Sequence, residues 1–170
     1  MIRPIDVAHV NLNVTDLERA IRFYTDLLGF TVAFQYEGAV AWLNFGQYRE
    51  GVGGPGQGFH DLALYRVARP ALEDRRQRAG MNHVALRLAS PDEVDRAAEF
   101  LATKGIRVLK GPQTHKEDND RYLYFEDPDG NMIEGWWRAR SRGGRSNTGG
   151  HSPPRHRRVT GPAKHVRLRS

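Results

Sequence analysis

Hydrophobic and polar residues follow the same order twice along the first 138 residues. Segments 9–14 and 83–88 each begin with a histidine and then alternate apolar and polar side chains, as in a strand with one buried face. Apolar residues at helical spacing come next, within 17–28 and within 94–101. We therefore predict an internal repeat in which each half begins with a strand followed by a helix.

Both predicted helices have signals for where they begin and end. A Ser or Thr is followed three residues later by Glu, and this pair can satisfy free backbone amides of the first turn. A glycine suited to the left-handed conformation ends each helix. The positions are Thr15, Glu18 and Gly29 in the first half and Ser90, Glu93 and Gly105 in the second.

Three further strands complete each half of the repeat. The turn at 127–130, Asp-Pro-Asp-Gly, separates the last two. Each half then reads as a βαβββ module, and neither alone has a large core, so the two should pair into one α+β domain. We predict this domain over 1–138, with modules at about 5–70 and 80–138. The added strands are about 30–37, 39–46 and 59–67, then 106–110, 121–127 and 130–138.

The last part of the chain has a different composition. After Arg138 come nine Lys or Arg, no Asp or Glu, and many Gly, Ser and Pro. Residues 1–138 have a net charge of −3, so the +6 of the whole chain comes from this segment. We predict that 139–170 is a basic disordered tail. It is either an electrostatic arm for RNA, DNA or an acidic membrane, or a solvated segment without a specific role.

Composition also excludes several kinds of chemistry. The chain has no cysteine, which excludes disulfides, zinc–thiolate sites, iron–sulfur clusters and thiol catalysis. It has no run of 18 apolar residues and no apolar segment near Met1 that resembles a signal peptide. We therefore expect a cytoplasmic protein without a membrane partner.

Four chemically active residues occupy matched places in the repeat. His9 and His60 are 51 residues apart, and so are His83 and Glu134. Imidazole and carboxylate bind divalent iron, manganese or zinc, and two His with one carboxylate form the facial triad of non-haem Fe(II) oxygenases. A two-fold repeat would bring the four positions together, which predicts a metal site.

The repeat and these motifs resemble the vicinal oxygen chelate superfamily over about residues 5–138. The segments 82–86 and 124–134 carry the resemblance most clearly. It implies two paired βαβββ modules that form a half-open barrel around a metal. Glyoxalases, epimerases, fosfomycin-modifying transferases, ring-cleaving dioxygenases and metal-free drug-binding proteins share these motifs.

Within that superfamily the sequence is most similar to single-domain type I extradiol ring-cleavage dioxygenases. Classical members have an additional, non-catalytic pair of modules, and this chain has one pair. The resemblance implies that His9, His83 and Glu134 bind Fe(II), with Mn(II) as an option. It makes His60 an acid–base residue that does not bind the metal, and Tyr124 the donor that orients the substrate.

Two further residues match the family pattern. His115, nine residues before the tyrosine, would contact a substrate oxygen or shape the pocket, and Asp118 would at most support its neighbours. His115 also lies in a polar segment, 113–118, and could simply face water. The glycine-rich segment 51–58 lacks the end of a phosphate-binding loop and is expected to be a flexible loop near the site. Trp42, Phe45 and Trp136 either line a flat aromatic pocket or belong to the core.

The leading hypothesis from the sequence is an Fe(II)-dependent extradiol dioxygenase that cleaves a catechol with O2, in aromatic compound catabolism. The alternatives are a glyoxalase-like lyase or fosfomycin thiol transferase that uses Mn, Ni or Zn, and a metal-free protein that binds an aromatic antibiotic. A lyase or epimerase would place a fourth ligand at position 60, typically carboxylate or amide, so His60 fits it less well. A nucleic-acid partner rests on the tail alone, and exposed sheet edges and helices make a homodimer an option.

Overall fold

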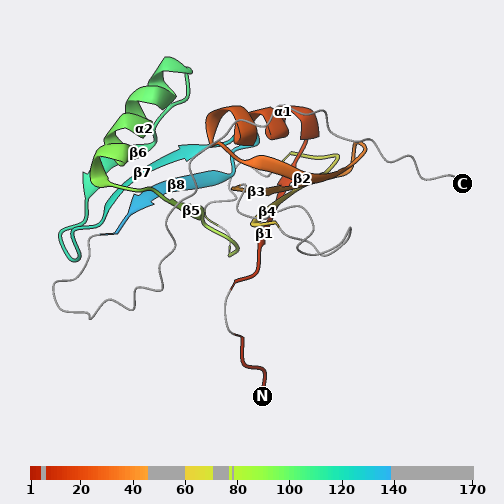
Figure 1. Ribbon diagram of the computed structural model, residues 1–170, viewed down its shortest axis with the longest axis horizontal. Coiled ribbons are helices and arrows are strands. Elements are labelled where there is room, and N and C mark those ends of the chain that lie inside the picture. Colours follow the sequence, from red (N-terminus) through yellow and green to blue (C-terminus); the bar gives the residue numbers. More distant parts are fainter. Residues whose placement is uncertain (5–6, 46–59, 71–76, 78, 139–170) are drawn as a thin grey trace, which may run out of the picture. The chain divides into compact units, whose positions relative to one another are not determined.

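The computed structural model describes residues 1–4, 7–45, 60–70, 77 and 79–138, which lie within the unit Met1–Ala139. The predicted tail and the glycine-rich segment fall outside the described residues. The first module contains β1 (Val10–Val14), α1 (Leu17–Arg22), the π-helical turn η1 (Phe23–Leu27), β2 (Thr31–Tyr36), β3 (Val40–Asn44) and β4 (Leu62–Arg66). The second contains β5 (Val84–Arg87), α2 (Pro91–Thr103), β6 (Lys110–Thr114), β7 (Arg121–Glu126) and β8 (Met132–Trp137) (Figure 1).

Each module forms its own four-stranded sheet with the same strand order. The first sheet runs β1-β4-β3-β2 and the second β5-β8-β7-β6. The first and last strands of each module pair in parallel, and the other pairs are antiparallel. The predicted α+β class with two βαβββ modules is confirmed. We call the two sheets sheet A and sheet B.

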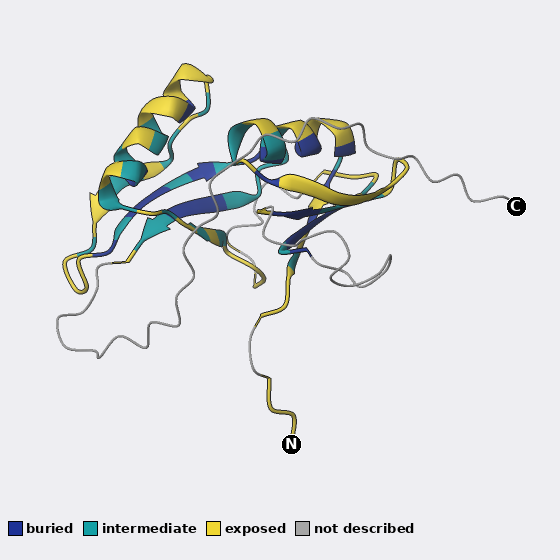
Figure 2. Cartoon of the chain, in the orientation of Figure 1, coloured by how far each residue is buried: buried dark blue, intermediate teal, exposed yellow. Residues whose placement is uncertain are grey.

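One face of each sheet is covered by the helix of the same module (Figure 2). In sheet A the side chains of Leu12, Leu43 and Leu64 belong to the buried core. Neighbouring residues in a strand point to opposite faces, so Asn11 and Trp42 lie on the face away from α1. By the same alternation, Tyr124 and Glu134 of sheet B lie on the face away from α2.

The start of α1 differs from the prediction. Asp16 is the N-cap, and its side chain accepts a 3.0 Å hydrogen bond from the backbone amide of Arg19. The Thr15 hydroxyl instead donates to Asp129 at 2.5 Å. A hydrogen bond to an ionised carboxylate is stronger than one between neutral groups. The bond to Asp129 therefore holds the Thr15 side chain away from the backbone amides of the first helical turn. In α2 the cap is Ser90, which accepts from the amide of Glu93 as predicted.

The strand predicted at 106–110 was placed too early. Strand β6 begins at Lys110, where the prediction ended it, and includes polar Gln113 and Thr114. Ile106 and Val108 do pack against the core, but outside the hydrogen-bonded ladder. β6 is an edge strand, and an edge strand can contain polar residues. The apolar residues of 106–110 therefore indicate contact with the core and not pairing with a neighbouring strand.

Candidate metal and acid–base site

The second module brings three of the predicted site residues together. His83 immediately precedes β5, and Glu134 on β8 pairs with Ala85 of β5 and with Tyr124 of β7. The Nε2 atom of His83 lies 3.0 Å from Oε2 of Glu134. The ring of His83 meets that of Tyr124 edge-on, with centroids 5.2 Å apart. An imidazole nitrogen, a carboxylate and a phenol therefore share one end of sheet B.

The neighbouring Asn82 fixes which nitrogen of His83 is available. Its side-chain oxygen lies 2.9 Å from Nδ1 of His83. An amide oxygen only accepts hydrogen bonds, so Nδ1 carries the proton and donates it. Nε2 is then the nitrogen that faces the Glu134 carboxylate. A partner on the second ring nitrogen is what orients a metal-binding histidine in proteins.

Tyr124 is held in its neutral form. Burial raises the pKa of its phenol to about 12, and a hydrogen bond to Glu134 and the negative charge of that carboxylate add to the effect. A phenol with this pKa stays protonated at neutral pH and serves as a donor rather than a base. The orienting role expected for Tyr124 from the sequence would use a protonated hydroxyl of this kind, and that role stays a prediction.

The first module forms a second cluster from His9, His60 and Trp42. The rings of His9 and His60 lie 4.4 Å apart between centroids, and His60 stacks on Trp42 at 4.9 Å with 10° between the planes. His60 is 8% exposed, whereas His9 is exposed. Trp42 therefore belongs to the candidate site through its contact with His60, and one face of its indole is taken up by that ring.

His60 and Glu134 are not equivalent in strand register, although their spacings in the sequence match. Glu134 pairs with Ala85 inside the β5–β8 ladder. The corresponding position of β1, Asn11, pairs with Ala63. His60 lies three residues earlier, before β4 begins. The position equivalent to the Glu134 carboxylate thus holds an alanine.

His115 reaches this site only through another ring. It follows β6 and stacks on Tyr122 at 4.1 Å, and Tyr122 in turn meets Tyr124 at 5.5 Å. Tyr122 is missing from the predicted site, although its spacing of two residues from Tyr124 on one strand places both side chains on one face. Asp118 is exposed and accepts a hydrogen bond from the amide of Asp120, so it shapes the loop.

The candidate metal donors lie in two separate pairs, and each pair consists of residue types that bind a divalent metal. His83 and Glu134 form one half, and His9 with His60 forms the other. Among the described residues, no group of three or more His, Asp or Glu is gathered closely enough to hold a metal ion. Nε2 of His83 and Oε2 of Glu134 lie 3.0 Å apart, and both are donor types that a divalent first-row cation binds.

The two other aromatic residues considered for the pocket, Phe45 and Trp136, have different surroundings. Phe45 is 49% exposed and contacts the buried ring of Phe30, with centroids 4.2 Å apart. Trp136 is partly buried on β8, and the guanidinium groups of Arg87 and Arg138 both lie near its ring. Among the described residues, the rings that contact Trp42 are those of Phe34 and His60 rather than these two.

Comparison with known proteins places the chain in a family. The model of the Glyoxalase/Bleomycin resistance protein/Dioxygenase superfamily matches residues 6–134. The chain therefore belongs to this superfamily, as the resemblance implied. A crystal structure of a glyoxalase/bleomycin resistance protein/dioxygenase from Nocardioides is 27% identical, with a TM-score of 0.55 over 88% of this chain and 93% of that one. A lactoylglutathione lyase from Agrobacterium tumefaciens has a TM-score of 0.59 at 19% identity, over 79% and 95% of the two chains, and confirms the fold.

Curated relatives include members with different activities. A 2-epi-5-epi-valiolone epimerase from an Actinomyces species is 31% identical over 150 residues, which is 76% of this chain and 78% of that protein. A probable lactoylglutathione lyase from Vibrio cholerae is 23% identical over 133 residues, 75% of this chain and 87% of the relative. Extradiol cleavage, the metal's identity and the cytoplasmic location stay predictions. None of the helices in the described ranges is long and apolar enough to cross a membrane.

Proposed function

We propose that this protein is a metal-dependent enzyme that moves a proton on a small substrate bearing oxygen atoms on adjacent carbons. The reaction belongs to the epimerase or lyase class and needs no oxygen. The observation that supports it best is the grouping of His83, Glu134 and Tyr124, where a metal-binding pair and a neutral phenol donor meet on one carboxylate. This combination suits an enzyme that uses both Lewis-acid and proton chemistry.

The metal would be held by His9, His83 and Glu134, the set expected from the sequence. When bound, a divalent cation polarises the oxygen atoms of the substrate and so makes the adjacent C–H bond more acidic. Asn82 keeps Nε2 of His83 directed at the site by accepting from Nδ1. The Tyr124 hydroxyl donates a hydrogen bond and orients the substrate oxygen.

His60 is the acid–base group in this proposal. An imidazole titrates near neutral pH and can both accept and return a proton. The stacking of His60 on Trp42 fixes the plane of its ring, and a positioned base transfers protons more effectively than a mobile one. His115 would act through the Tyr122 ring and shape the substrate pocket from there.

A homodimer explains why the two halves of the donor set lie apart. We propose that His9 and His60 of one copy complete the site around His83 and Glu134 of a second copy. The test mixes two variants, His9→Ala and His83→Ala, each inactive alone. Subunit exchange would then create one intact site per mixed dimer and restore activity. If all ligands of a site came from one chain, every site in the mixture would remain damaged and no activity would return.

Extradiol cleavage of a catechol is the second candidate, and one observation favours it. The sequence pattern would give a lyase or epimerase a fourth ligand with an oxygen donor at position 60, and this chain has instead an imidazole, His60, stacked on Trp42. A histidine that does not bind the metal would suit removal of a proton from a catechol hydroxyl and the later return of that proton. The similarity to an epimerase and to a probable lyase supports the first candidate instead.

One experiment separates the two candidates. The protein is reconstituted without oxygen using Fe(II), Mn(II), Ni(II) or Zn(II). It is then given two panels, catechols in air and hydroxyketones in deuterated water without oxygen. Exchange of a substrate proton for deuterium without oxygen supports the epimerase or lyase class. Oxygen uptake coupled to a ring-opened product supports extradiol cleavage and overturns the first candidate. Failure to bind any of the four metals would overturn both and leave a metal-free binding protein.

A further inference from the structure

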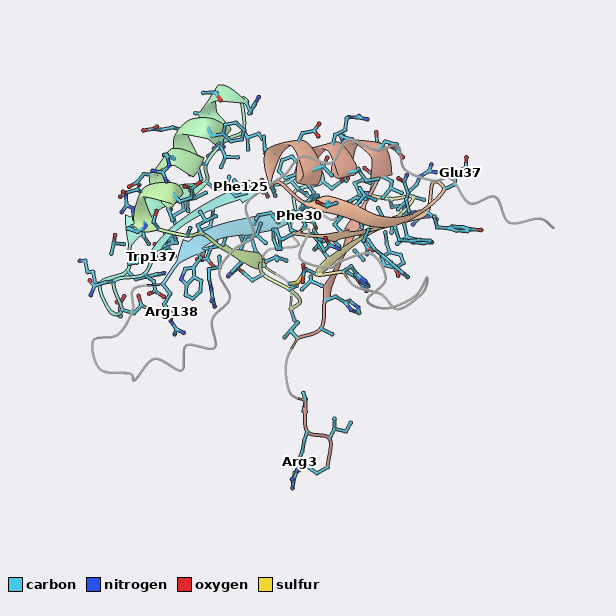
Figure 3. All side chains as sticks on the ribbon, in the orientation of Figure 1. Arg3, Phe30, Glu37, Phe125, Trp137 and Arg138 are labelled. Carbon is cyan, nitrogen blue, oxygen red and sulfur yellow. The ribbon has the colours of Figure 1, made fainter. Side chains whose placement is uncertain are left out.

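Positively charged side chains gather on the face of sheet B that carries Glu134 and Tyr124. Arg87 on β5 pairs with Trp136 on β8, and Lys110 on β6 pairs with Tyr124 on β7. Because paired residues in a sheet share a face, both cations lie on the same side as the candidate site. Arg138 follows the end of β8 (Figure 3).

Aromatic rings support all three cations. The guanidinium carbons of Arg87 and Arg138 lie 5.9 and 5.6 Å from the centre of the Trp136 ring. The ammonium of Lys110 lies 5.3 Å from the centre of the Tyr122 ring. Tyr122 and Trp136 are themselves paired across β7 and β8. Contacts of this kind restrict long side chains and still leave their N–H donors available to a ligand.

Of these three cations, Arg138 forms an ion pair with a carboxylate, Asp120, whereas Arg87 and Lys110 do not in the described ranges. Asp120 is 3% exposed and lies 4.0 Å from Nε of Arg138. Glu134 faces His83, and Glu126 lies beyond Tyr124, at the other end from Tyr122. Across the described ranges, no carboxylate lies within ion-pair distance of Arg87 or Lys110. The charges of Arg87 and Lys110 therefore stay available to a ligand next to the candidate metal site.

The first module shows that the fold does not require this charge. Aligning His83 with His9 makes Asn13 the counterpart of Arg87, and the paired positions make Phe34 the counterpart of Lys110. The corresponding face of sheet A thus has an amide and an aromatic ring where sheet B has two cations. At these two pairs of equivalent positions the charge is found in the second module alone, which points to a ligand rather than to the stability of the sheet.

We propose that this face of sheet B binds an anionic group of the substrate, a carboxylate or a phosphate, through Arg87, Lys110 and Arg138. The proposal rests on the proposed function, because the anion belongs to the molecule whose adjacent oxygens bind beside Glu134. A guanidinium recognises either anion through two parallel N–H donors. The substrate is then a small organic acid or phosphate ester with oxygens on adjacent carbons, rather than a neutral sugar-like or purely aromatic compound.

The test measures anion binding separately from catalysis. Inorganic phosphate and malonate are titrated into the metal-free protein and followed by calorimetry. The variants are Arg87→Gln and Lys110→Gln, and the matched control is Arg107→Gln, an exposed arginine that lies outside these contacts. We expect saturable binding of at least one anion, weakened about tenfold or more by each variant and less than twofold by the control. The anion that binds distinguishes phosphate from carboxylate.

Two outcomes would overturn the proposal. One is that neither anion binds the unaltered protein, and the other is that Arg107→Gln weakens binding as much as Arg87→Gln, which would mean that only the net charge matters. Metal content is measured in the same samples, and each variant's unfolding temperature checks that it is folded. Anion binding without metal binding would contradict the proposed function alone, and metal binding without anion binding would contradict this inference alone.

Discussion

The hydroxyl of Tyr24, in the helical segment of the first module, donates a 3.1 Å hydrogen bond to Asp127, in the β7–β8 turn of the second. Both residues are buried, with exposures of 1% and 4%. Asp127 also accepts from the backbone amides of Asp129 and Asn131 and from the Asn131 side chain. One carboxylate therefore closes the turn and fastens it to the other module, so the turn and the module contact depend on each other.

Replacing Tyr24 by Phe should destabilise the protein without changing its fold. The ring remains in the core, but Asp127 loses one of its donors, and losing a hydrogen bond to a charged group costs about 1.5–3 kcal/mol. Chemical denaturation measures the loss in the free energy of unfolding. Tyr36→Phe is the control, because Tyr36 is 57% exposed and its hydroxyl should contribute little. Equal stability of the two variants would contradict this account.

The same pair predicts how stability falls at alkaline pH. Burial, and then the negative charge of Asp127, raise the pKa of Tyr24 well above its ordinary value of 10.0. The folded state thus holds this proton more tightly than the unfolded state does. Its contribution is complete below pH 10.0 and is lost as the pH rises toward the folded-state pKa. Denaturation between about pH 8 and pH 11 should show a steeper decline in the unaltered protein than in Tyr24→Phe.

The order of helices and strands could be predicted because each one is indicated by residues close together in the sequence. Alternating residues, helix caps and the turn at 127–130 each act over a few residues, and the repetition of the pattern supports each assignment. The predictions failed where a distant residue decides the local structure. Thr15 was predicted to cap the first helix, but its hydroxyl donates a hydrogen bond to Asp129. Ile106 and Val108 pack on the core without joining the sheet.

The sequence offers a set of candidate site residues, but it does not give their arrangement. The equal spacings suggested that His60 and Glu134 are equivalent, yet strand register separates them. Equal numbers of intervening residues do not fix register, because the intervening strands and loops differ in length. The contact of His60 with Trp42 and the charges around Trp136 depend on residues on different strands. Such contacts are visible only once the strands are paired.

Two glycines test the role of backbone conformation. Gly29 and Gly111 both have positive φ, at 74° and 85°. A Cβ on Gly29 would meet nothing within 4 Å, whereas one on Gly111 would lie 2.5 Å from the Tyr122 carbonyl oxygen. We expect Gly29→Ala to cost about 1 kcal/mol from conformational strain alone. Gly111→Ala adds a clash with backbone and should cost about 3 kcal/mol or more. Similar unfolding free energies for the two variants would contradict the close contact at Gly111.

The pKa of Tyr124 should respond to Glu134. The raised value of about 12 has burial as its main cause, followed by the hydrogen bond and the charge of Glu134. In Glu134→Gln the charge is gone and burial remains, so the pKa should fall but stay above 10.0. Ultraviolet titration of the phenolate measures it, with Tyr124→Phe used to subtract the other tyrosines. An unchanged value in Glu134→Gln would show that the two side chains do not interact.

Metal binding and proton transfer should separate by mutation. His83→Ala or Glu134→Gln removes one donor of the pair that lies 3.0 Å apart, so both variants should lose bound metal, measured as metal content after dialysis. His60→Phe keeps a ring that can stack on Trp42 and should retain metal and substrate binding. It should lower turnover by about 10²–10⁴-fold, the usual contribution of a general acid–base residue.

His115→Ala serves as the control for metal content, because His115 contacts Tyr122 rather than the metal-binding pair. Full metal content in His83→Ala would rule out the assigned site, and full turnover in His60→Phe would remove His60 from the chemistry while leaving the metal site intact.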